Sequence, residues 1–190
     1  MIQPIVKLRF VERYCPPSQG WSVFVDIDPS EEGRTGSTRQ SAEARERQFF
    51  AQRDAPRARK ELERLGAFVG DRSRKWKAHF GATLPIVQGD RDIIAVHQGL
   101  RVLWIAEVEG DSGGQPEGKI YKAIGQLVIA ASECRIPEFR TLLTVVVWGG
   151  RLQAHLARAA ALVRMDISGL AVRENARDDH WLFGRPDHLG

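Results

Sequence analysis

Four carboxylates fall in two short segments of the sequence that are typical of neighbouring β-strands. Asp90 and Asp92 open the segment GDRDIIAV, and Glu107 and Glu109 end the segment RVLWIAEVE. Carboxylate oxygens are the ligands that hard divalent cations prefer, and Mg²⁺ is the expected one. A divalent cation held by acids can activate a water molecule for hydrolysis. These acids therefore predict a metal site formed by two adjacent strands.

The segment RVLWIAEVE predicts a strand that is buried and yet carries charge. Side chains alternate along a strand, so Glu107 and Glu109 share one face with Leu103 and Ile105. The other face is entirely apolar: Val102, Trp104, Ala106 and Val108. Apolar residues on both faces favour burial. The alternative is an edge hairpin whose acids face solvent.

The register between the two strands decides whether the acids meet. A two-residue turn at Gln98–Gly99 would place Asp90 opposite Glu107, with Asp92 one step diagonal to it. Two carboxylates ~4 Å apart repel each other by ~4 kcal/mol at an effective dielectric constant of ~20. The cluster would therefore need raised pKa values, cationic neighbours or a bound metal.

A helix is predicted to follow the acidic strand, over residues 116–132. Lys119, Lys122 and Gln126 form a polar stripe on it at i, i+3 and i+7. A separate apolar stripe is expected to face the sheet: Ile120, Ile124, Leu127, Val128 and Ala131. The polar stripe either faces the carboxylates or is an ordinary exposed surface.

The elements before the acidic hairpin are less regular. The segments PIVKLRFVER and GWSVFVDID predict two strands, which form an N-terminal hairpin within residues 1–33. Residues 34–88 form a basic helical segment, with a helix over Ser41–Leu65 that Pro56 should break or kink.

After the acidic hairpin, predicted strands alternate with predicted helices. The segments TLLTVVVWGG and ISGLAVRE predict strands, with the helix RLQAHLARAAALVRM between them, and residues 175–190 read as a poorly specified tail. Apolar strands alternating with helices predict one α/β domain, a mixed sheet flanked by helices, with its core over residues 89–174.

Positive charge is concentrated before this core. Residues 34–77 contain 13 Lys and Arg against 6 Asp and Glu, whereas the whole chain carries a net charge of only +4. Such a block is typical of proteins that bind a polyanion. The alternative is a solvated helix whose charges form salt bridges with each other.

The stretch GDSGG around Ser112 matches a signature of trypsin-like serine proteases. A serine nucleophile needs a histidine base, and none of the five histidines lies in a fitting context. Ser112 is therefore predicted to lie in a Gly-rich loop and to have no part in catalysis.

The cysteine content and the lack of long apolar runs bear on the expected cellular location. Cys15 and Cys134 have no regular spacing, which suits a reducing environment. No run approaches the ~18–20 apolar residues that span a membrane. The expected location is the cytoplasm.

The order GDRDIIAV, AEVE and GKIYKAIGQLV resembles the PD-(D/E)XK nuclease superfamily. That family has an Asp on one hairpin strand, (Asp/Glu)-x-Lys on the next, and then a helix with polar residues. The resemblance covers about Gly89 to Val172 and implies a restriction endonuclease-like core, here with the N-terminal hairpin as an extension. This sequence is a variant, because Glu109 stands where the family usually has Lys.

The resemblance implies roles for individual residues. Asp92, Glu107 and the backbone carbonyl of Val108 would be metal ligands, with Asp90 as the fallback. Glu109 would act as a base or position water, as in family members with Glu-x-Glu. The absent lysine charge would come from the helix, which also contributes a polar side chain: Lys119, Lys122 and Gln126.

The implied function is Mg²⁺- or Mn²⁺-dependent cleavage of phosphodiester bonds in DNA, of restriction or repair type. Double-stranded DNA is the expected partner, and a homodimer is left open. Phosphates would be held by basic residues of the block: Arg57, Arg59, Lys60, Arg72, Arg74, Lys75 and Lys77. The alternative is an inactive nucleic-acid-binding module on the same fold.

Overall fold

A computed structural model describes residues 1–27, 42–70, 91–110, 115–134 and 136–187. The strands are β1 (Trp21–Asp26), β2 (Phe68–Gly70), β3 (Ile93–His97), β4 (Val102–Glu109), β5 (Arg140–Trp148), β6 (Ile167–Val172) and β7 (His180–Phe183). The α-helices are α1 (Gln3–Tyr14), α2 (Ala42–Arg64), α4 (Pro116–Glu133) and α5 (Arg151–Ala157). The short 3₁₀ helices are η1 (Pro17–Gln19), η3 (Ala160–Met165) and η4 (Ala176–Asp178).

The strands in the described part of the chain form one mixed sheet in the order β2-β1-β3-β4-β5-β6-β7. The strands β4, β5 and β6 run parallel, whereas β3 is antiparallel to both of its neighbours. Helix α4 connects β4 to β5, and α5 with η3 connects β5 to β6, which is the arrangement that parallel neighbours require. The prediction of an α/β fold with a mixed sheet is confirmed.

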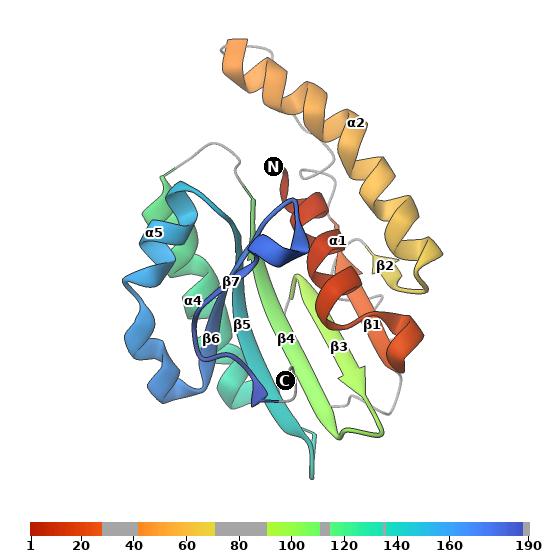
Figure 1. The fold of residues 1–190 in the computed structure, drawn as a ribbon, viewed down its shortest axis with the longest axis vertical. Coiled ribbons are helices and arrows are strands. Elements are labelled where there is room, and N and C mark those ends of the chain that lie inside the picture. The colour runs from red at the N-terminus through yellow and green to blue at the C-terminus, as the bar shows by residue number, and fades with distance from the viewer. Residues whose placement is uncertain (28–41, 71–90, 111–114, 135, 188–190) are drawn as a thin grey trace.

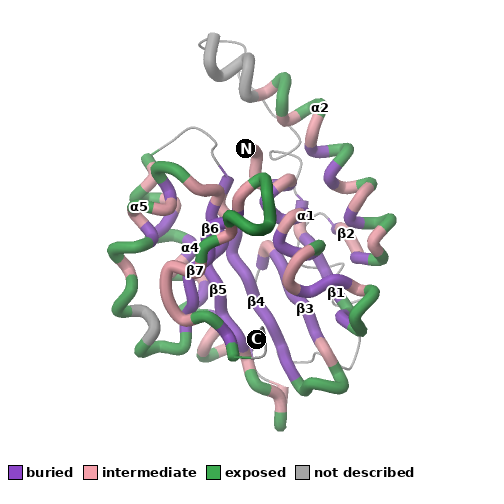
Figure 2. The backbone as a smooth tube through the Cα atoms, in the orientation of Figure 1, coloured by how far each residue is buried: buried purple, intermediate pink, exposed green. Residues whose placement is uncertain are grey.

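Helices cover both faces of this sheet (Figure 1). Helix α1 packs on one face, over a core that includes Val6, Phe10 and Trp104. Helices α4 and α5 pack on the other face, over a core that includes Leu127 and Leu156. The central strands are buried along most of their length (Figure 2). The alternation predicted for β4 is confirmed, because its two sets of side chains enter the two different cores.

The prediction of an N-terminal β-hairpin is wrong, since residues 3–14 form helix α1. The letters VKLRF alternate as a strand would, but the buried Val6 and Phe10 also lie four residues apart, on one helical face. Pro4 lies in the first turn, where its missing N–H costs no hydrogen bond. Only the second segment, Trp21–Asp26, is a strand.

Helix α2 runs through Pro56 without the break that the sequence predicted. Its buried side chains, Ala55, Ala58 and Leu62, recur at helical spacing and pack toward the domain. Tertiary packing of this face therefore outweighs the local cost of proline. The predicted helix after β5 is shorter than expected, because α5 ends at Ala157 and the chain continues as the 3₁₀ helix η3.

The C-terminal segment from residue 175 is an ordered part of the fold up to residue 187, which corrects the prediction of a tail. Strand β7 pairs with β6. Asp179, with only 4 % of its side chain exposed, accepts hydrogen bonds from Arg13 Nη1 at 2.8 Å and Tyr14 Oη at 2.9 Å. Burial and the hydrogen bond to Asp179 raise the pKa of Tyr14. These contacts join the C-terminal segment to the end of α1.

Candidate functional site

The acidic hairpin forms with a register two residues away from the predicted one. Ile93 pairs with Ala106, so the ladder extended by one residue places Asp92 beside Glu107. The turn covers residues 98–101 and ends with Arg101 at φ 52°, a left-handed conformation. Both common two-residue hairpin turns need positive φ at the first central position, which Gln98 does not favour. A two-residue shift keeps every side chain on its predicted face, so the acids still meet.

Asp92 is held by donors from two directions. The backbone N–H of Val108 donates to Asp92 Oδ2 at 2.8 Å. Lys7 Nζ, from helix α1, forms an ion pair with Asp92 Oδ1 at 2.8 Å. Gln3 Nε2, one helical turn earlier, lies 3.3 Å from Oδ2 and 3.4 Å from Oδ1. These contacts fix the orientation of the carboxylate at the start of β3.

Glu107 is buried without full satisfaction of its carboxyl group. The residue is 2 % exposed, and within the described residues its Oε1 atom has no hydrogen-bond partner. Burial, followed by repulsion from Asp92, raises the pKa of Glu107 to about 9, against lowering contributions from Arg91 and Lys7. A buried acceptor of this kind is costly unless a proton or a cation is supplied. At neutral pH the carboxyl therefore carries a proton when no cation is bound.

Glu109, two residues along the same strand face, is only partly buried. Burial raises its pKa to about 7, and the positive charges of Lys119 and Lys122 oppose the rise. Lys119 Nζ also donates to the carbonyl oxygen of Gly110 at 3.3 Å. The first turns of α4 therefore bring both predicted lysines toward Glu109, whereas the cations near Asp92 come from elsewhere.

Two buried cations of the site, Lys7 and Arg91, were missed by the sequence analysis. Lys7 is 0 % exposed and Arg91 is 6 % exposed. Arg91 reaches Glu133 of α4 at 3.7 Å, and its charge lowers the pKa of Glu107. The available signal for Lys7 was its place among Val6, Leu8 and Phe10, but it required the segment to be recognised as a helix.

The start of α1 lies directly against the end of the acidic strand. A Cβ atom built on Gly110 would clash with the backbone atoms of Ile2 and Gln3. Only glycine permits such an approach of two backbones. Gly110 thus sets how closely Gln3 and Lys7 are brought to Asp92.

We expect Gly110→Ala to displace the start of α1 and to destabilise the protein by about 1–3 kcal/mol, because backbone atoms must shift to admit the methyl group. Denaturant unfolding measures the change. The matched control is Gly118→Ala, since nothing lies within 4 Å of a Cβ at that position in α4. The control should gain up to about 1 kcal/mol from higher helix propensity. Equal effects of the two changes would contradict the close approach.

Other predicted site residues are not brought into this cluster. Gln126 is half-buried on α4, and no hydrogen bond joins it to Asp92 or Glu107 in the described part of the chain. Several predicted positions lie outside the described residues: Asp90, Arg72, Arg74, Lys75 and Lys77, together with Ser112. Arg57, Arg59 and Lys60 lie on α2, where Arg57 and Lys60 are exposed and Arg59 donates to the carbonyl oxygen of Ile27 at 3.0 Å.

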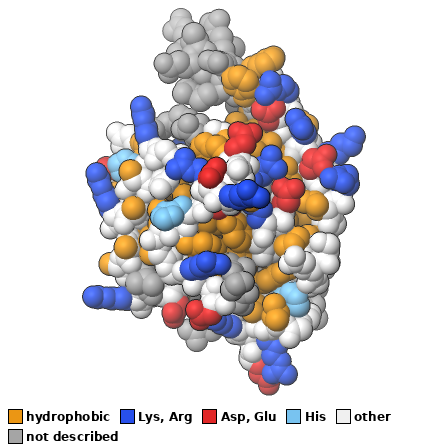
Figure 3. All heavy atoms as spheres, viewed as in Figure 1, with side chains coloured by type: hydrophobic (Ala, Val, Ile, Leu, Met, Phe, Trp, Pro, Cys, Tyr) orange, Lys and Arg blue, Asp and Glu red, His pale blue; other side chains and the backbone are white. Residues whose placement is uncertain are grey.

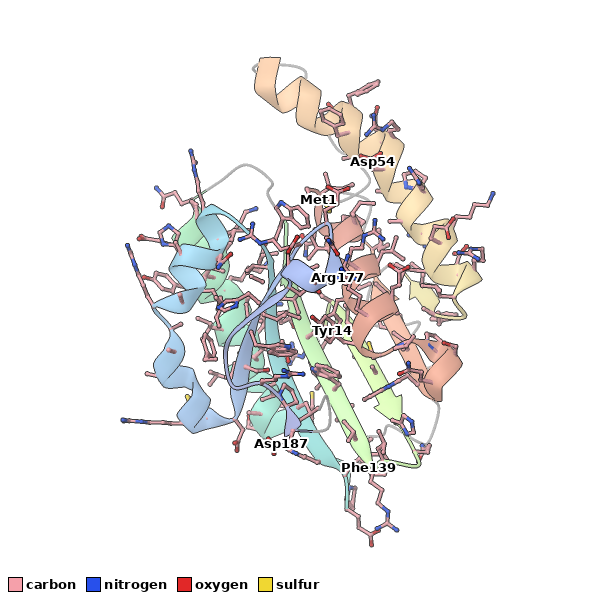
Figure 4. The ribbon with its side chains drawn as sticks, viewed as in Figure 1. Met1, Tyr14, Asp54, Phe139, Arg177 and Asp187 are labelled. Carbon is pink, nitrogen blue, oxygen red and sulfur yellow. The ribbon has the colours of Figure 1, made fainter. Side chains whose placement is uncertain are left out.

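A groove of about 750 Å³ lies between α1 and α2, and Figure 4 labels Met1 and Asp54 on its two sides. Its charged lining is mixed rather than purely basic: Arg9, Glu12, Arg53, Asp54, Arg57, Glu61, Arg64 and Glu174. Several of these charges pair with each other, including Arg53 with Asp54 at 2.6 Å. Figure 3 shows basic and acidic side chains interspersed on this side of the molecule. The described part of the basic block is therefore laced with ion pairs.

The residues present fit a divalent cation with few protein ligands. No group of three or more Asp, Glu, His or Cys side chains gathers closely enough to hold a metal within the described ranges. Mg²⁺ is usually held by one or two carboxylates, with water and substrate phosphate completing its shell. The pair Asp92 and Glu107 is such a set, and the unpartnered Oε1 of Glu107 is the atom that a cation would satisfy.

Comparison with known proteins gives no match of any kind: no family model, no curated protein and no solved structure is similar to this chain. None of the helices in the described residues is long and apolar enough to cross a bilayer.

Proposed function

We propose that this chain is a metal-dependent nuclease that hydrolyses phosphodiester bonds in DNA, on a core like that of the PD-(D/E)XK superfamily. One observation supports it most. Asp92 and Glu107 lie side by side at the end of an antiparallel hairpin, and Glu107 Oε1 is buried with no partner among the described residues. Burying the unpartnered oxygen of Glu107 costs stability, so a ligand that needs this carboxylate explains its presence.

Asp92 and Glu107 would hold Mg²⁺ or Mn²⁺, with the carbonyl of Val108 as a third ligand and Asp90 as the fallback. The cation would supply Lewis acidity and lower the pKa of a bound water. Asp92 is already oriented for this role by the N–H of Val108.

Glu109 would accept the proton of the attacking water. Its pKa of about 7 is close to the pH at which a general base works best. Lys119 and Lys122 lie on the same side and would stabilise the negative charge that develops on the phosphate. Gln126, further along α4, would contact the DNA backbone.

Double-stranded DNA would be held beside the site by the basic block, from which Arg57 and Lys60 project into solvent. A homodimer would allow both strands to be cut. We expect neutralising Arg57, Arg59 and Lys60 together to reduce the slope of log K against log salt by about 2, since each phosphate contact contributes ~0.9 and Arg59 already bonds to Ile27.

The measurement is fluorescence anisotropy with a DNA duplex between about 50 and 200 mM salt, the range over which counterion release dominates binding. The control neutralises Arg151 and Arg164, which are exposed on and after α5, away from α2. Equal slopes for the wild type and the triple variant would mean that the block is only a solvated surface.

The alternative function is a catalytically inactive nucleic-acid-binding module on the same fold. It is favoured by the donors that already engage Asp92, and by Glu109 at the position where the superfamily has lysine. An inactive module would keep the fold and the salt-dependent binding, but it would need neither acid of the pair.

Plasmid nicking with Mg²⁺ and with Mn²⁺ distinguishes the two functions. We expect nicking by the wild type, loss of nicking in Asp92→Asn, and DNA affinity in that variant within about threefold of wild type. If the wild type nicks no DNA or RNA substrate with either metal, yet binds DNA with both acids replaced, the binding module is the correct function.

A further inference from the structure

We infer that Lys7 is a positioning residue of this site: it orients Asp92 from helix α1 and holds a positive charge beside the acidic pair. This inference rests on the proposed function and assigns a role to a residue outside the hairpin and outside α4. Lys7 thus adds a positive charge beside Asp92 from the opposite face of the sheet, in addition to the lysines of α4.

The burial of Lys7 is the first observation. Its side chain is 0 % exposed, and lysine is almost never fully buried unless it is paired. The neighbouring buried residues of α1 are apolar, so a leucine or methionine would pack at this position without loss of hydration. Replacing both partners of a buried ion pair by apolar residues is often neutral for stability, so a stable fold does not require the pair of Lys7 and Asp92.

The direction of the side chain is the second observation. Lys7 belongs to the helix that packs on the Trp104 face of the sheet, yet its Nζ atom reaches Asp92 at 2.8 Å and also donates to the carbonyl of Asp26. Gln3 lies four residues earlier on the same face of α1 and contacts the same carboxylate. Two successive turns of α1 therefore each contribute a side chain that contacts Asp92.

The division of cations within the site is the third observation. Lys119 is engaged with the carbonyl of Gly110 and, with Lys122, acts mainly on Glu109. Lys7, by contrast, forms its ion pair directly with Asp92. Lys7 is therefore the lysine whose loss changes the charge at the acidic pair most.

This role predicts opposite effects on metal binding and on cleavage. A positive charge next to Asp92 repels an incoming cation, so Lys7→Met should tighten binding of Mg²⁺ about tenfold. The same change frees the Asp92 side chain and removes a charge, so the cleavage rate should fall about 10²-fold. A merely structural lysine would weaken metal binding and cleavage together with stability.

The test measures Mg²⁺ affinity by isothermal titration, single-turnover cleavage, and the thermal midpoint for wild type, Lys7→Met and the control Arg9→Met. Arg9 lies on the same helix and pairs with Glu12 at 3.0 Å, so its loss should change neither affinity nor rate. Unchanged metal affinity and cleavage in Lys7→Met, or a parallel fall of both with the thermal midpoint, would overturn the inference.

A measurement on wild-type protein covers the case in which Lys7→Met does not fold. The ammonium group of a fully buried lysine exchanges slowly and is visible by ¹⁵N NMR. Saturating Mg²⁺ should shift this resonance and Mn²⁺ should broaden it. An unaffected resonance in protein that binds metal would overturn the inference about Lys7 and leave the proposed function standing. If the wild type binds neither metal, the proposed function fails, and the role of Lys7 fails with it.

Discussion

Glu107→Gln should abolish cleavage and at the same time make the protein more stable. In the proposed site Glu107 holds the cation, and glutamine removes the charge that does so, so we expect cleavage to fall by at least ~10³-fold. Stability should rise because the folded protein keeps Glu107 protonated, with a pKa of about 9, whereas the unfolded chain ionises it near 4.5. At pH 7 this difference costs roughly 3 kcal/mol of folding free energy.

Glutamine removes that cost and keeps the shape of the side chain. Its amide can donate to Asp92 in place of the acid proton, so a gain of about 2–3 kcal/mol is expected at pH 7 in metal-free buffer. Urea unfolding at pH 5 and pH 7 measures it. The sign follows from the raised pKa: the wild type loses stability as pH rises from about 4.5 to 9, and the variant lacks this loss.

The control for this prediction is Asp54→Asn on α2, whose carboxylate pairs with Arg53 near the surface. A surface substitution should change stability by no more than ~0.5 kcal/mol. If Glu107→Gln is less stable than the wild type at pH 7, then Glu107 is a satisfied structural residue, and the proposed metal site has lost its main support.

Metal affinity should rise steeply with pH. If Glu107 is a ligand, as proposed, it must release its proton to bind a cation, and the apparent Kd for Mg²⁺ should fall about tenfold for each pH unit between 7 and 9, and then level off. One proton per cation should be released over this range. Titration calorimetry in two buffers of different ionisation enthalpy counts the proton directly.

Glu109→Gln is the matched control for the pH dependence. The pKa of Glu109 is about 7. Its loss should therefore change how the Kd for Mg²⁺ varies with pH near and below neutral pH, and should leave the tenfold change per pH unit between pH 7 and 9 intact. A Kd that does not vary from pH 7 to 9 would show that Glu107 is not a ligand.

The acidic hairpin and α4 could be predicted because their patterns are strong and local. The strands β3 and β4 have dense apolar runs, and the stripe on α4 repeats at helical spacing. The register could not be predicted, because it depends on the left-handed conformation of Arg101 at the turn. Asp92 and Glu107 still lie side by side, because the predicted register differs from the observed one by two residues and a two-residue shift keeps each side chain on the same face of the sheet.

The part of the site contributed by α1 could not be predicted for a different reason. The alternation in VKLRF fits a strand, whereas its buried residues in the structure pack as a helical face against the core that includes Trp104. The partners of Lys7 and Arg13, Asp92 and Asp179, lie far away along the chain. Contacts between residues so far apart along the chain produce no recognisable pattern in the neighbouring sequence. Asp179 was therefore assigned to a tail, although it fixes the end of α1.

The bond between Arg13 and Asp179 has a consequence for protein synthesis. The two residues are 166 positions apart, so α1 leaves the ribosome long before its partner is made. The hydrogen bonds at the outer end of α1 form only when residues 173–179 have emerged. A nascent chain can therefore form the acidic hairpin early, whereas the contacts that hold the outer end of α1 form only late in synthesis.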